Sequence, residues 1–524
     1  MIIEGQSRLK EYSMTVTKKI FAVSLAFALL AANIYAQDDW GGDDSSVEET
    51  AELTFWDKFK ISGDATLAGR GYVGKYVENK AVSELDTPVY PIPRLKLGFD
   101  YEGAATKFSS KLRFDEQTLR YDNEMILDEF SADLFVGNWV LSAGKMKVVW
   151  GKGDKLHVLD NFNANNYYDF LMPDYLDRRS SEYMFRAQYN SPRGFRFEGI
   201  YTPIMHGESY ASKGPWVPGK VATLTNSVKQ IQAATILTAA GPTGALNQAS
   251  LAALMNASSM SADSLYPDTH SLRYGQFGGY FNFTLGMFDF GISYYNGHYK
   301  QVSSDASGTI IYNAAQQSPL VGQLFPNALS NAMPKLHYDT LQSFGLDMQT
   351  ALGPFTIRAE VVYNMTEDMS GNDPWVHNNS IGYLFGFDFS LPIHNVTLNI
   401  QGTGNVILKR DNIDNYKILG LVAVPGTKQY DVDYDPTGCY TNHKIVIQLQ
   451  DTFYYEKITA TLKAIYGIER YDLLVMPELS FKVRDGWKVS ASGLIIHNFD
   501  KDENSEFNGW LDNSFVQLAV NYTF

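Results

Sequence analysis

Residues 195–201 read FRFEGIY, and this stretch decides the fold because charged and aromatic side chains alternate along it. Read with a period of two, its aromatic side chains share one face of a strand, while Arg196 and Glu198 share the other. The same alternation recurs in residues 94–101, 107–115 and 355–361. These runs last about 9 to 11 residues, the length that a tilted strand needs to cross a membrane. We therefore predict an all-β fold whose apolar strand faces meet lipid.

Very short turns alternate with longer segments along the chain. The turns are expected at residues 103–104, 137–138, 191–194, 285–286, 353–354, 393–395, 455–456 and 485–486. Short periplasmic turns and long extracellular loops are typical of outer-membrane barrels. With one further strand near each end, the pattern predicts a transmembrane antiparallel up-and-down β-barrel of about 18 strands (16–18) over residues 57–524.

The last residues, 514–524, read SFVQLAVNYTF. Their apolar side chains fall on one face, and the stretch ends on Phe524. This resembles the C-terminal signal that the barrel-assembly machinery recognises in outer-membrane proteins. The resemblance implies that Phe524 serves as an assembly signal, and that the assembly machinery and outer-membrane lipid are partners of the chain.

The N-terminal side carries a second targeting signal. Lys18 and Lys19 precede the apolar stretch IFAVSLAFALLAANIYA, which ends at Ala36. A basic start, a short apolar region and a small last residue predict a signal peptide over residues 1–36. The acidic residues 37–56 are then expected to form a periplasmic tail. Together these features predict an outer-membrane location with both termini in the periplasm.

Composition and motifs exclude several classes of protein. The net charge of −15 disfavours a nucleic-acid partner, and the single Cys439 allows no intrachain disulfide. The sequence contains no nucleophile elbow, zinc-binding helix motif or phosphate loop, so we expect neither an enzyme nor a bound cofactor. No metal site is expected, because the acidic loops 431–435 and 500–504 lack the glycine turn of a calcium loop.

Charged side chains opposite the apolar faces are expected to point into the barrel. The predicted lumen-lining residues are Lys107, Lys111, Arg113, Asp115, Lys145, Lys147, Arg186, Arg196, Glu198, Arg358 and Glu360. A barrel of this size can hold an aqueous channel unless something fills it. Basic and acidic groups alternate around the wall, so the set can also be a mutually neutralised network rather than a selective ring.

The longest loop, residues 203–274, is the predicted obstruction. It contains two apolar helical patterns, in residues 224–231 and 246–255, on either side of Gly241-Pro242. A helix-bearing loop can fold into a pore or cap it. The alternative is that the helices pack on each other outside the barrel.

A family resemblance rests on residues 144–154, GKMKVVWGKGD, which continue to LDNFN at 159–163. The stretch resembles a barrel family of unknown function in which a strand ends in Gly-Arg-Gln, continues to Trp-Gly-Glu and enters a loop with an Asn-Pro-x-Asp element. Members of that family are thought to accompany exporters of hydrophobic lipids, and alginate-export barrels share a related pattern. Here Lys145-Met146 stands in place of Arg-Gln, and Lys152 in place of Glu.

This loop motif comprises Trp150, Gly151, Asp154, Asp160 and Asp169. Trp150 at a strand end is expected to be an aromatic residue of the membrane interface, and Gly151 to turn the loop inward. The three aspartates are available to pair with the arginines at 178 and 179.

The sequence thus predicts a pore or transport barrel that passes small or hydrophobic solutes passively and is gated by the 203–274 loop. One alternative is a surface adhesin with a plugged lumen. A second is a barrel enzyme, for which His298, His337 and His497 would be candidates.

Overall fold

The computed structural model describes residues 58–74, 89–154, 156–240, 262–415, 428–500 and 505–524. The predicted signal peptide and acidic tail lie outside the described residues. The second helical pattern of the longest loop, at 246–255, lies outside them as well.

Within the described residues, 18 strands form one sheet that closes on itself. Each strand pairs antiparallel with its neighbour along the chain, and the last strand pairs with the first. The strands are β1 Phe59–Tyr72, β2 Tyr90–Glu102, β3 Thr106–Phe114, β4 Leu127–Val136, β5 Trp139–Met146, β7 Glu182–Asn190, β8 Phe195–Thr202, β10 Gln276–Leu285, β11 Phe288–His298, β14 Thr340–Leu352, β15 Phe355–Met365, β16 Ser380–Ser390, β17 Thr397–Ile407, β18 Lys444–Phe453, β19 Ile458–Gly467, β20 Asp472–Arg484, β21 Trp487–Asn498 and β22 Phe515–Thr523. The predicted all-β antiparallel barrel is confirmed.

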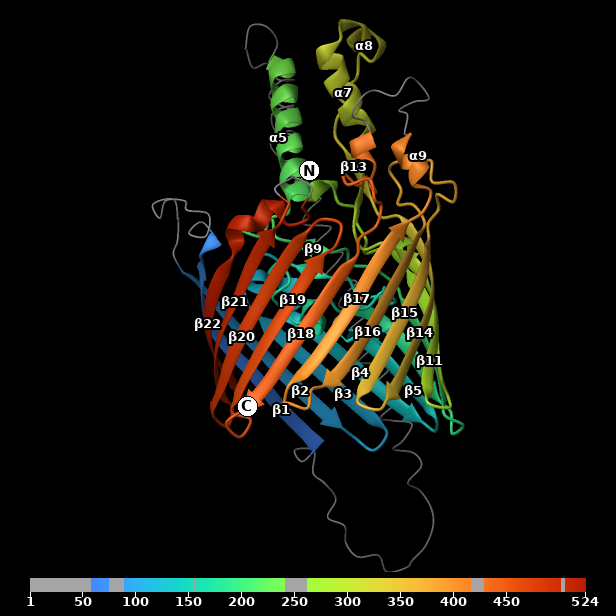
Figure 1. Cartoon of the computed structure of the whole chain (residues 1–524). Coiled ribbons are helices and arrows are strands. Elements are labelled where there is room, and N and C mark those ends of the chain that lie inside the picture. Colours follow the sequence, from blue (N-terminus) through green and yellow to red (C-terminus); the bar gives the residue numbers. More distant parts are fainter. Residues whose placement is uncertain (1–57, 75–88, 155, 241–261, 416–427, 501–504) are drawn as a thin grey trace, which may run out of the picture.

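Tight turns join the strands at one end of the barrel. Gly137, Gly353 and Gly486 each have a positive φ, of 57°, 59° and 77°, in turns that join β4 to β5, β14 to β15 and β20 to β21. Glycine adopts this conformation without steric cost. The start of β1 and the C-terminus lie at this end, which we call the turn end (Figure 1). The longer connections gather at the opposite, loop end.

The period-two pattern seen in the sequence sets the two faces of the wall. On β22, Val516, Leu518 and Val520 are 53%, 64% and 42% exposed and point outward. Gln517 and Asn521 pair with Arg70 and Thr66 of β1 and point inward. A barrel with an apolar exterior and a polar interior is built to lie in a bilayer.

Phe524 closes the barrel seam. Its amide donates to the carbonyl of Gly63 at 3.0 Å, and its carbonyl accepts from the amide of Gly63 at 2.9 Å. A Cβ atom on Gly63 would lie 2.2 Å from the Phe524 ring. The predicted assembly residue therefore also packs on the first strand of the closed sheet.

Helices and small strand pairs belong to the connections. The helices are α3 Glu116–Arg120, α4 Tyr175–Arg178, α5 Gly219–Ala240, α7 Ser307–Gln317, α8 Pro319–Leu324 and α9 Arg410–Asp414. Short 3₁₀ helices are η3 Asn123–Ile126, η4 Ala262–Leu265, η5 Leu272–Tyr274, η7 Lys428–Tyr430 and η8 Asn508–Asn513. The strand pairs are β6 Asn166–Tyr167 with β9 Ser209–Tyr210 and β12 Ser303–Asp305 with β13 Lys335–His337. In the described residues, no helix is both long and apolar enough to cross a membrane.

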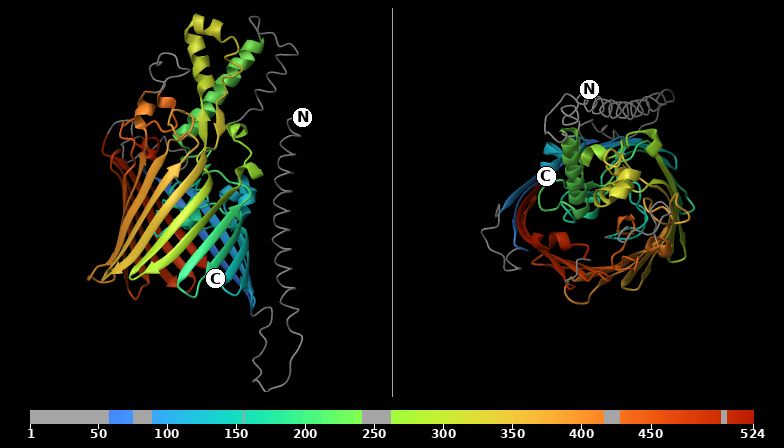
Figure 2. Two further views of the ribbon diagram at one scale, coloured as in Figure 1. Left: turned by 90° about the vertical axis from the view of Figure 1, so that its right-hand side faces the viewer. Right: turned by 90° about the horizontal axis from the view of Figure 1, so that it is seen from above.

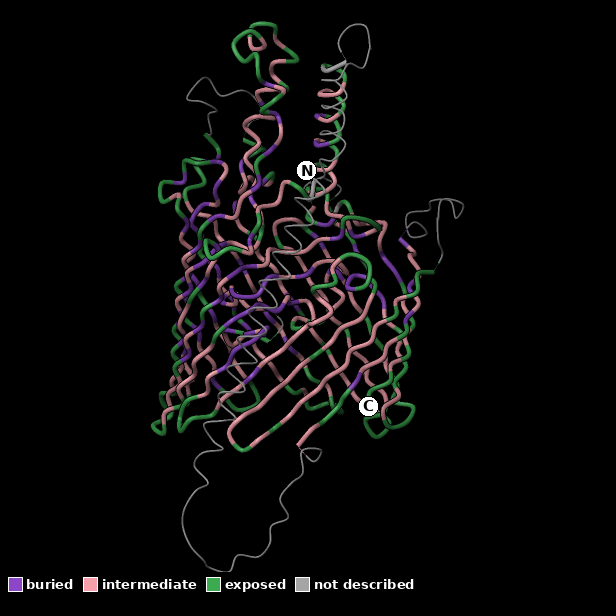
Figure 3. The backbone as a smooth tube through the Cα atoms, turned by 180° about the vertical axis from the view of Figure 1, so that it is seen from behind, coloured by how far each residue is buried: buried purple, intermediate pink, exposed green. Residues whose placement is uncertain are grey.

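The interior is filled unevenly along the barrel axis. Buried segments gather inside the barrel in the half nearer the loop end, while the half nearer the turn end is formed mainly by the wall itself (Figure 3). Helices α5, α7 and α8 rise beyond the loop end (Figures 1 and 2). The buried material in the lumen comes from the connection between β5 and β7, together with parts of the β8–β10 and β21–β22 connections.

A constriction segment and the cavity beside it

Residues 147–181, which we call the constriction segment, leave β5 and enter the barrel. Gly151 makes the turn with a φ of 105°, in the region that favours glycine. A Cβ atom here would lie 2.3 Å from Oε1 of Glu360, so no side chain fits. The turn inward that the sequence indicated at Gly151 is present.

Two buried carboxylates hold this segment against one side of the wall. Glu360 of β15 accepts hydrogen bonds from the amides of Gly153 at 2.5 Å and Val158 at 2.9 Å. Glu198 of β8 accepts one from the indole of Trp150 at 2.8 Å. Both carboxylates come from residues at most 2% exposed, where hydrogen bonds to a charged acceptor are strong.

Aromatic packing fills the same side of the lumen. The ring of Trp150 lies 5.0 Å from that of Phe162 and 5.6 Å from that of Tyr280, measured between centroids. Phe162 also meets Tyr295, edge to face, at 5.1 Å. Trp150 is only 2% exposed, so its expected place at the membrane interface is wrong. It anchors an internal core instead, because the chain turns inward directly after it.

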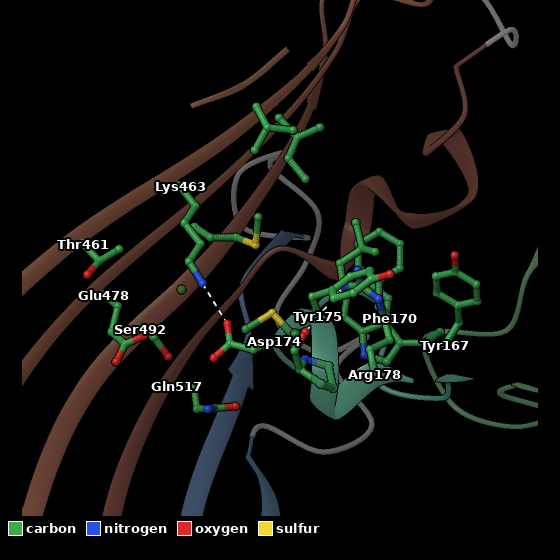
Figure 4. A pocket seen from close by; sticks show the side chains of 18 of the residues that line it. Tyr167, Phe170, Asp174, Tyr175, Arg178, Thr461, Lys463, Glu478, Ser492 and Gln517 are labelled. Atoms are coloured by element: carbon green, nitrogen blue, oxygen red, sulfur yellow. Dashed lines mark hydrogen bonds and ion pairs between the residues drawn. The ribbon is translucent and has the colours of Figure 1, made fainter. Parts of the chain in front are cut away.

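Ion pairs tie the same segment to the other side of the barrel. Lys96 of β2 lies 2.6 Å from Asp177, and Lys463 of β19 lies 3.0 Å from Asp174 (Figure 4). A third pair joins Arg70 of β1 to Asp169, with nitrogen and oxygen 2.5 Å apart. One segment that contacts β8 and β15 as well as β1, β2 and β19 must cross the lumen.

Between this segment and the wall lies a cavity of about 700 Å³. Strands β18 to β22, β1 and β2 supply its wall, including Arg94, Lys444, Lys463, Glu478 and Lys488. Aromatic side chains cover the facing side: Tyr167, Phe170, Trp216, Phe507 and Trp510. Phe170 and Trp216 stack with centroids 4.8 Å apart and planes at 3°. The open part of the lumen is therefore off-centre, with a charged wall and an aromatic cover.

None of the predicted lumen-lining residues borders this cavity. Glu198 and Glu360 point inward, but they are buried beneath the constriction segment as anchors. Lys145 is 5% exposed, and its ammonium donates to the carbonyls of Glu124 and Leu127. These three residues therefore do not line open water, because connections that the sequence did not place cover them.

The remaining predicted lumen residues mostly form pairs along the wall. The pairs are Lys111 with Glu129 at 3.1 Å, Arg113 with Asp115 at 2.5 Å, Lys147 with Asp128 at 3.0 Å, Arg186 with Glu198 at 2.6 Å, and Arg358 with Asp388. Lys107 stands opposite Asp133 in the register, and Arg196 opposite Asn282. This arrangement agrees with the neutralised network that was the alternative to a selective ring.

The aspartates of the loop motif take different partners. Asp160 pairs with Arg179 at 3.0 Å, as the sequence suggested. Burial raises the pKa of Asp160, although Arg179 and the hydroxyl of Tyr175 oppose the shift. Asp169 pairs with Arg70 of the wall and not with Arg178 or Arg179. Asp154 accepts a hydrogen bond from the side-chain amide of Asn399 at 3.2 Å.

The cavity-lining lysines were missed although the sequence carries a signal for them. Residues 459–467 and 487–493 alternate in the same way as 195–201, with Lys463 and Lys488 on their polar faces. The aromatic cover could not be found in this way, because it joins the constriction segment to loops distant in sequence.

A cluster of polar side chains lies at the loop end, and of its members only His337 was named from the sequence. Ser303, His337 and His377 surround Asp339, with His337 Nε2 at 3.0 Å and His377 Nδ1 at 2.5 Å from its oxygens. The hydroxyl of Ser303 donates to Asp339 at 2.8 Å and lies 3.1 Å from the same His377 Nδ1. A catalytic triad needs the two imidazole nitrogens on different partners, so this geometry suits a structural latch. Of the other two candidate histidines, His298 ends β11 opposite Thr340, the residue after Asp339, and His497 lies on β21.

The predicted gating loop contributes less to the lumen than expected. Helix α5, which covers the first apolar pattern, rises away from the barrel at the loop end (Figure 2). Of the described residues of this loop, Glu208, Tyr210, Trp216 and Pro218 border the cavity.

Comparisons with known proteins give a likeness of structure only. No protein-family model matches the chain, and no curated protein matches it. Among solved structures, OccAB4 of Acinetobacter baumannii is 9% identical, with 89% of this chain and 97% of that chain covered and a TM-score of 0.43. OccK3 (OpdO) of Pseudomonas aeruginosa is 7% identical, with 89% and 95% covered and a TM-score of 0.44. An E1M, A104W mutant of Rh. blastica porin is 10% identical, with 89% and 100% covered and a TM-score of 0.36. The sequence resemblance to lipid-export and alginate-export barrels stays a prediction.

Proposed function

We propose that this chain is an outer-membrane pore through which small solutes move passively, on an off-centre path between the constriction segment and the wall of β18 to β22, β1 and β2. The observation that carries the proposal is the cavity of about 700 Å³ on that path. Its charged wall and aromatic cover can hold a solute that has both a polar and an apolar part. The periplasmic location of both termini is part of this proposal.

The charges at the cavity favour anionic solutes modestly. The pairs Lys463 with Asp174 and Lys444 with Glu506, at 3.0 and 2.9 Å, cancel charges of both signs. Of the remaining charges on the cavity wall, Arg94 and Lys488 are positive and Glu478 is negative. A lumen with a small surplus of positive charge attracts anions and slows cations, and salt screens the effect.

Conductance in planar bilayers tests this function. We expect the refolded protein to give stable single-channel steps, and a KCl gradient to give a reversal potential on the anion-selective side. Lys488→Gln should move the reversal potential toward cation selectivity without closing the channel. Silence of both the native protein and a variant lacking residues 220–258 would contradict the pore.

A surface-interaction role is the second candidate, favoured by the helices that rise beyond the loop end. Leu237 of α5 and Leu320 and Leu324 of α8 are 72%, 65% and 66% exposed. Exposed leucines on projecting helices are typical of contact surfaces. Deleting residues 220–258 separates the two roles, because a pore should keep its conductance when these residues are removed.

A further inference from the structure

Three side chains at the loop end, away from the cavity, bring metal-ligating atoms together. Glu124 belongs to η3 in the β3–β4 connection, while His206 and His270 belong to the β8–β10 connection. One ligand atom from each lies within 4.8 Å of the others. The two imidazole rings stand perpendicular with centroids 5.3 Å apart, and Nε2 of His270 lies 3.9 Å from a carboxylate oxygen of Glu124.

A carboxylate faces the Nδ1 atom of each histidine. Nδ1 of His206 lies 2.7 Å from Glu182, whose other oxygen accepts from the backbone amide of His206 at 2.8 Å. Nδ1 of His270 lies 3.5 Å from Asp268, which also accepts from the backbone amide of His270 at 3.0 Å. A carboxylate on Nδ1 fixes the tautomer that presents Nε2, and metal-binding histidines commonly have this outer partner.

The backbone holds the three ligand segments in place. The amide of Met205 donates to the carbonyl of Thr269 at 3.3 Å, which joins the two histidine segments. The ammonium of Lys145 donates to the carbonyl of Glu124 at 3.0 Å, which joins η3 to the end of β5. The ligand positions are therefore set by the fold before any ion binds, which lowers the cost of binding.

Space and charge at this place also suit a cation. A cavity of about 30 Å³ adjoins Glu124 and His206, enough for a water molecule or an ion. The side chain of Glu124 is 44% exposed, and those of His206 and His270 are 22% and 25% exposed. Ions in solution can therefore reach all three. Arg113, Lys145 and Arg179 also line this cavity. Arg113 pairs with Asp115 and Arg179 with Asp160, and the acidic groups Asp122, Glu124, Asp128 and Glu182 offset the charge of Lys145.

We propose that Glu124, His206 and His270 bind a divalent transition-metal ion of the Zn²⁺ class, with water in the fourth position. Two imidazoles and one carboxylate form a ligand set that Zn²⁺ uses with an open position. A bound ion would tie the β3–β4 connection to the β8–β10 connection. The sequence indicated no metal site because its three ligands lie far apart along the chain.

Calorimetric titration of the full-length protein with Zn²⁺ in detergent tests the site. We expect one ion to bind per chain, and His206→Gln, His270→Gln and Glu124→Gln each to abolish that binding. Asp268→Asn, which removes only an outer partner, should weaken it about tenfold or more. His394→Gln is the matched control, because His394 is an exposed histidine that pairs with Asp451 at the turn end.

Two further measurements separate loss of a ligand from loss of the fold. Heat-modifiable migration on a gel should show that every variant keeps a closed barrel. X-ray absorption at the zinc edge should show two imidazole nitrogens in the native protein and no protein-bound zinc in either histidine variant. The proposal is overturned if the native protein binds no Zn²⁺, or if a folded His206→Gln, His270→Gln double variant binds it with unchanged affinity.

Discussion

Nζ of Lys463 lies 3.0 Å from Oδ1 of Asp174, and this contact joins the wall of β19 to the constriction segment across the open side of the lumen. The opposite flank of that segment rests on an aromatic core and on buried carboxylates. The segment is thus firmly held on one flank and tied by ion pairs on the other. The flank that borders the solute path is the one whose contacts can be removed without dismantling the core.

We expect Asp174→Asn to raise single-channel conductance and its flicker, because the segment loses its contact with β19. The side chains of Lys463 and Asp174 are 35% and 82% exposed, so the pair contributes at most about 1 kcal/mol to stability. An unchanged unfolding midpoint should therefore accompany the change in conductance. The charge-swapped double variant, Asp174→Lys with Lys463→Asp, should return conductance toward the native value. Equal conductance in all three proteins would mean that the contact does not restrict the path.

Replacing Glu360 removes the anchor on the other flank. Glu360→Ala leaves the amides of Gly153 and Val158 without their acceptor, and a buried unpaired donor costs about 1–3 kcal/mol. We expect lower stability, noisier channels and faster proteolysis within the constriction segment. Glu360→Gln keeps one acceptor oxygen, so its stability, channel noise and rate of proteolysis should lie between those of the native protein and of Glu360→Ala. Glu478→Gln, on the cavity wall, should change ion selectivity while leaving noise and proteolysis as they are.

The sequence was sufficient for the barrel but not for what lies inside it. Alternation along single strands, as in 195–201, specifies which face meets lipid, and tight turns such as Gly137-Asn138 specify the pairing, so the strand number followed. The constriction segment covers some of the inward-pointing groups and leaves others in contact with water. Its position depends on contacts between residues that are distant in sequence. Glu360 of β15 and Gly151 are an example. They lie in contact, but nothing in the sequence around either residue indicates that contact.

The cluster around Asp339 should make the loop end sensitive to pH. Its hydrogen bond to Asp339 raises the pKa of His337, and although burial lowers the pKa of His377, the contacts with Asp339 raise it overall. Burial opposes ionisation of Asp339, but its two histidine partners lower its pKa overall. The contribution of the histidines is complete below their unfolded pKa of about 6.5 and is lost as pH rises through their folded values. That of Asp339 is present above about pH 3.9 and is lost on acidification.

Protection factors at Ser303 and at residues 375–379, which correct exchange rates for their intrinsic rise with pH, should therefore be higher at pH 5.5 than at pH 8.5. Asp339→Asn should remove this difference, because it removes the charge that favours both protonated imidazoles. His394→Gln, at the turn end, should leave it intact. Equal protection factors at the two pH values in the native protein would mean that the latch is not linked to protonation.

The pair of Arg70 and Asp169 should contribute more to stability than any exposed pair of the wall. The two guanidinium nitrogens lie 2.5 and 3.1 Å from the two carboxylate oxygens, and the guanidinium also lies 4.3 Å from the centre of the Phe515 ring. Because the Arg70 side chain is only 4% exposed, Asp169→Ala leaves a buried charge whose remaining partners, Gln517 and Tyr72, are uncharged. We expect a loss of about 2 kcal/mol in the free energy of unfolding, measured with urea in detergent.

The control for that measurement is Lys111→Gln, which breaks the pair with Glu129 on the wall. The side chain of Lys111 is 54% exposed, and an exposed pair contributes less than about 1 kcal/mol. Asp169→Asn should lie between the two, because it keeps an acceptor oxygen but loses the charge. If Asp169→Ala and Lys111→Gln shift the unfolding midpoint equally, Arg70 does not depend on the constriction segment for its neutralisation. The segment would then be held by its aromatic core, by Glu198 and Glu360, and by the ion pairs of Lys96 and Lys463.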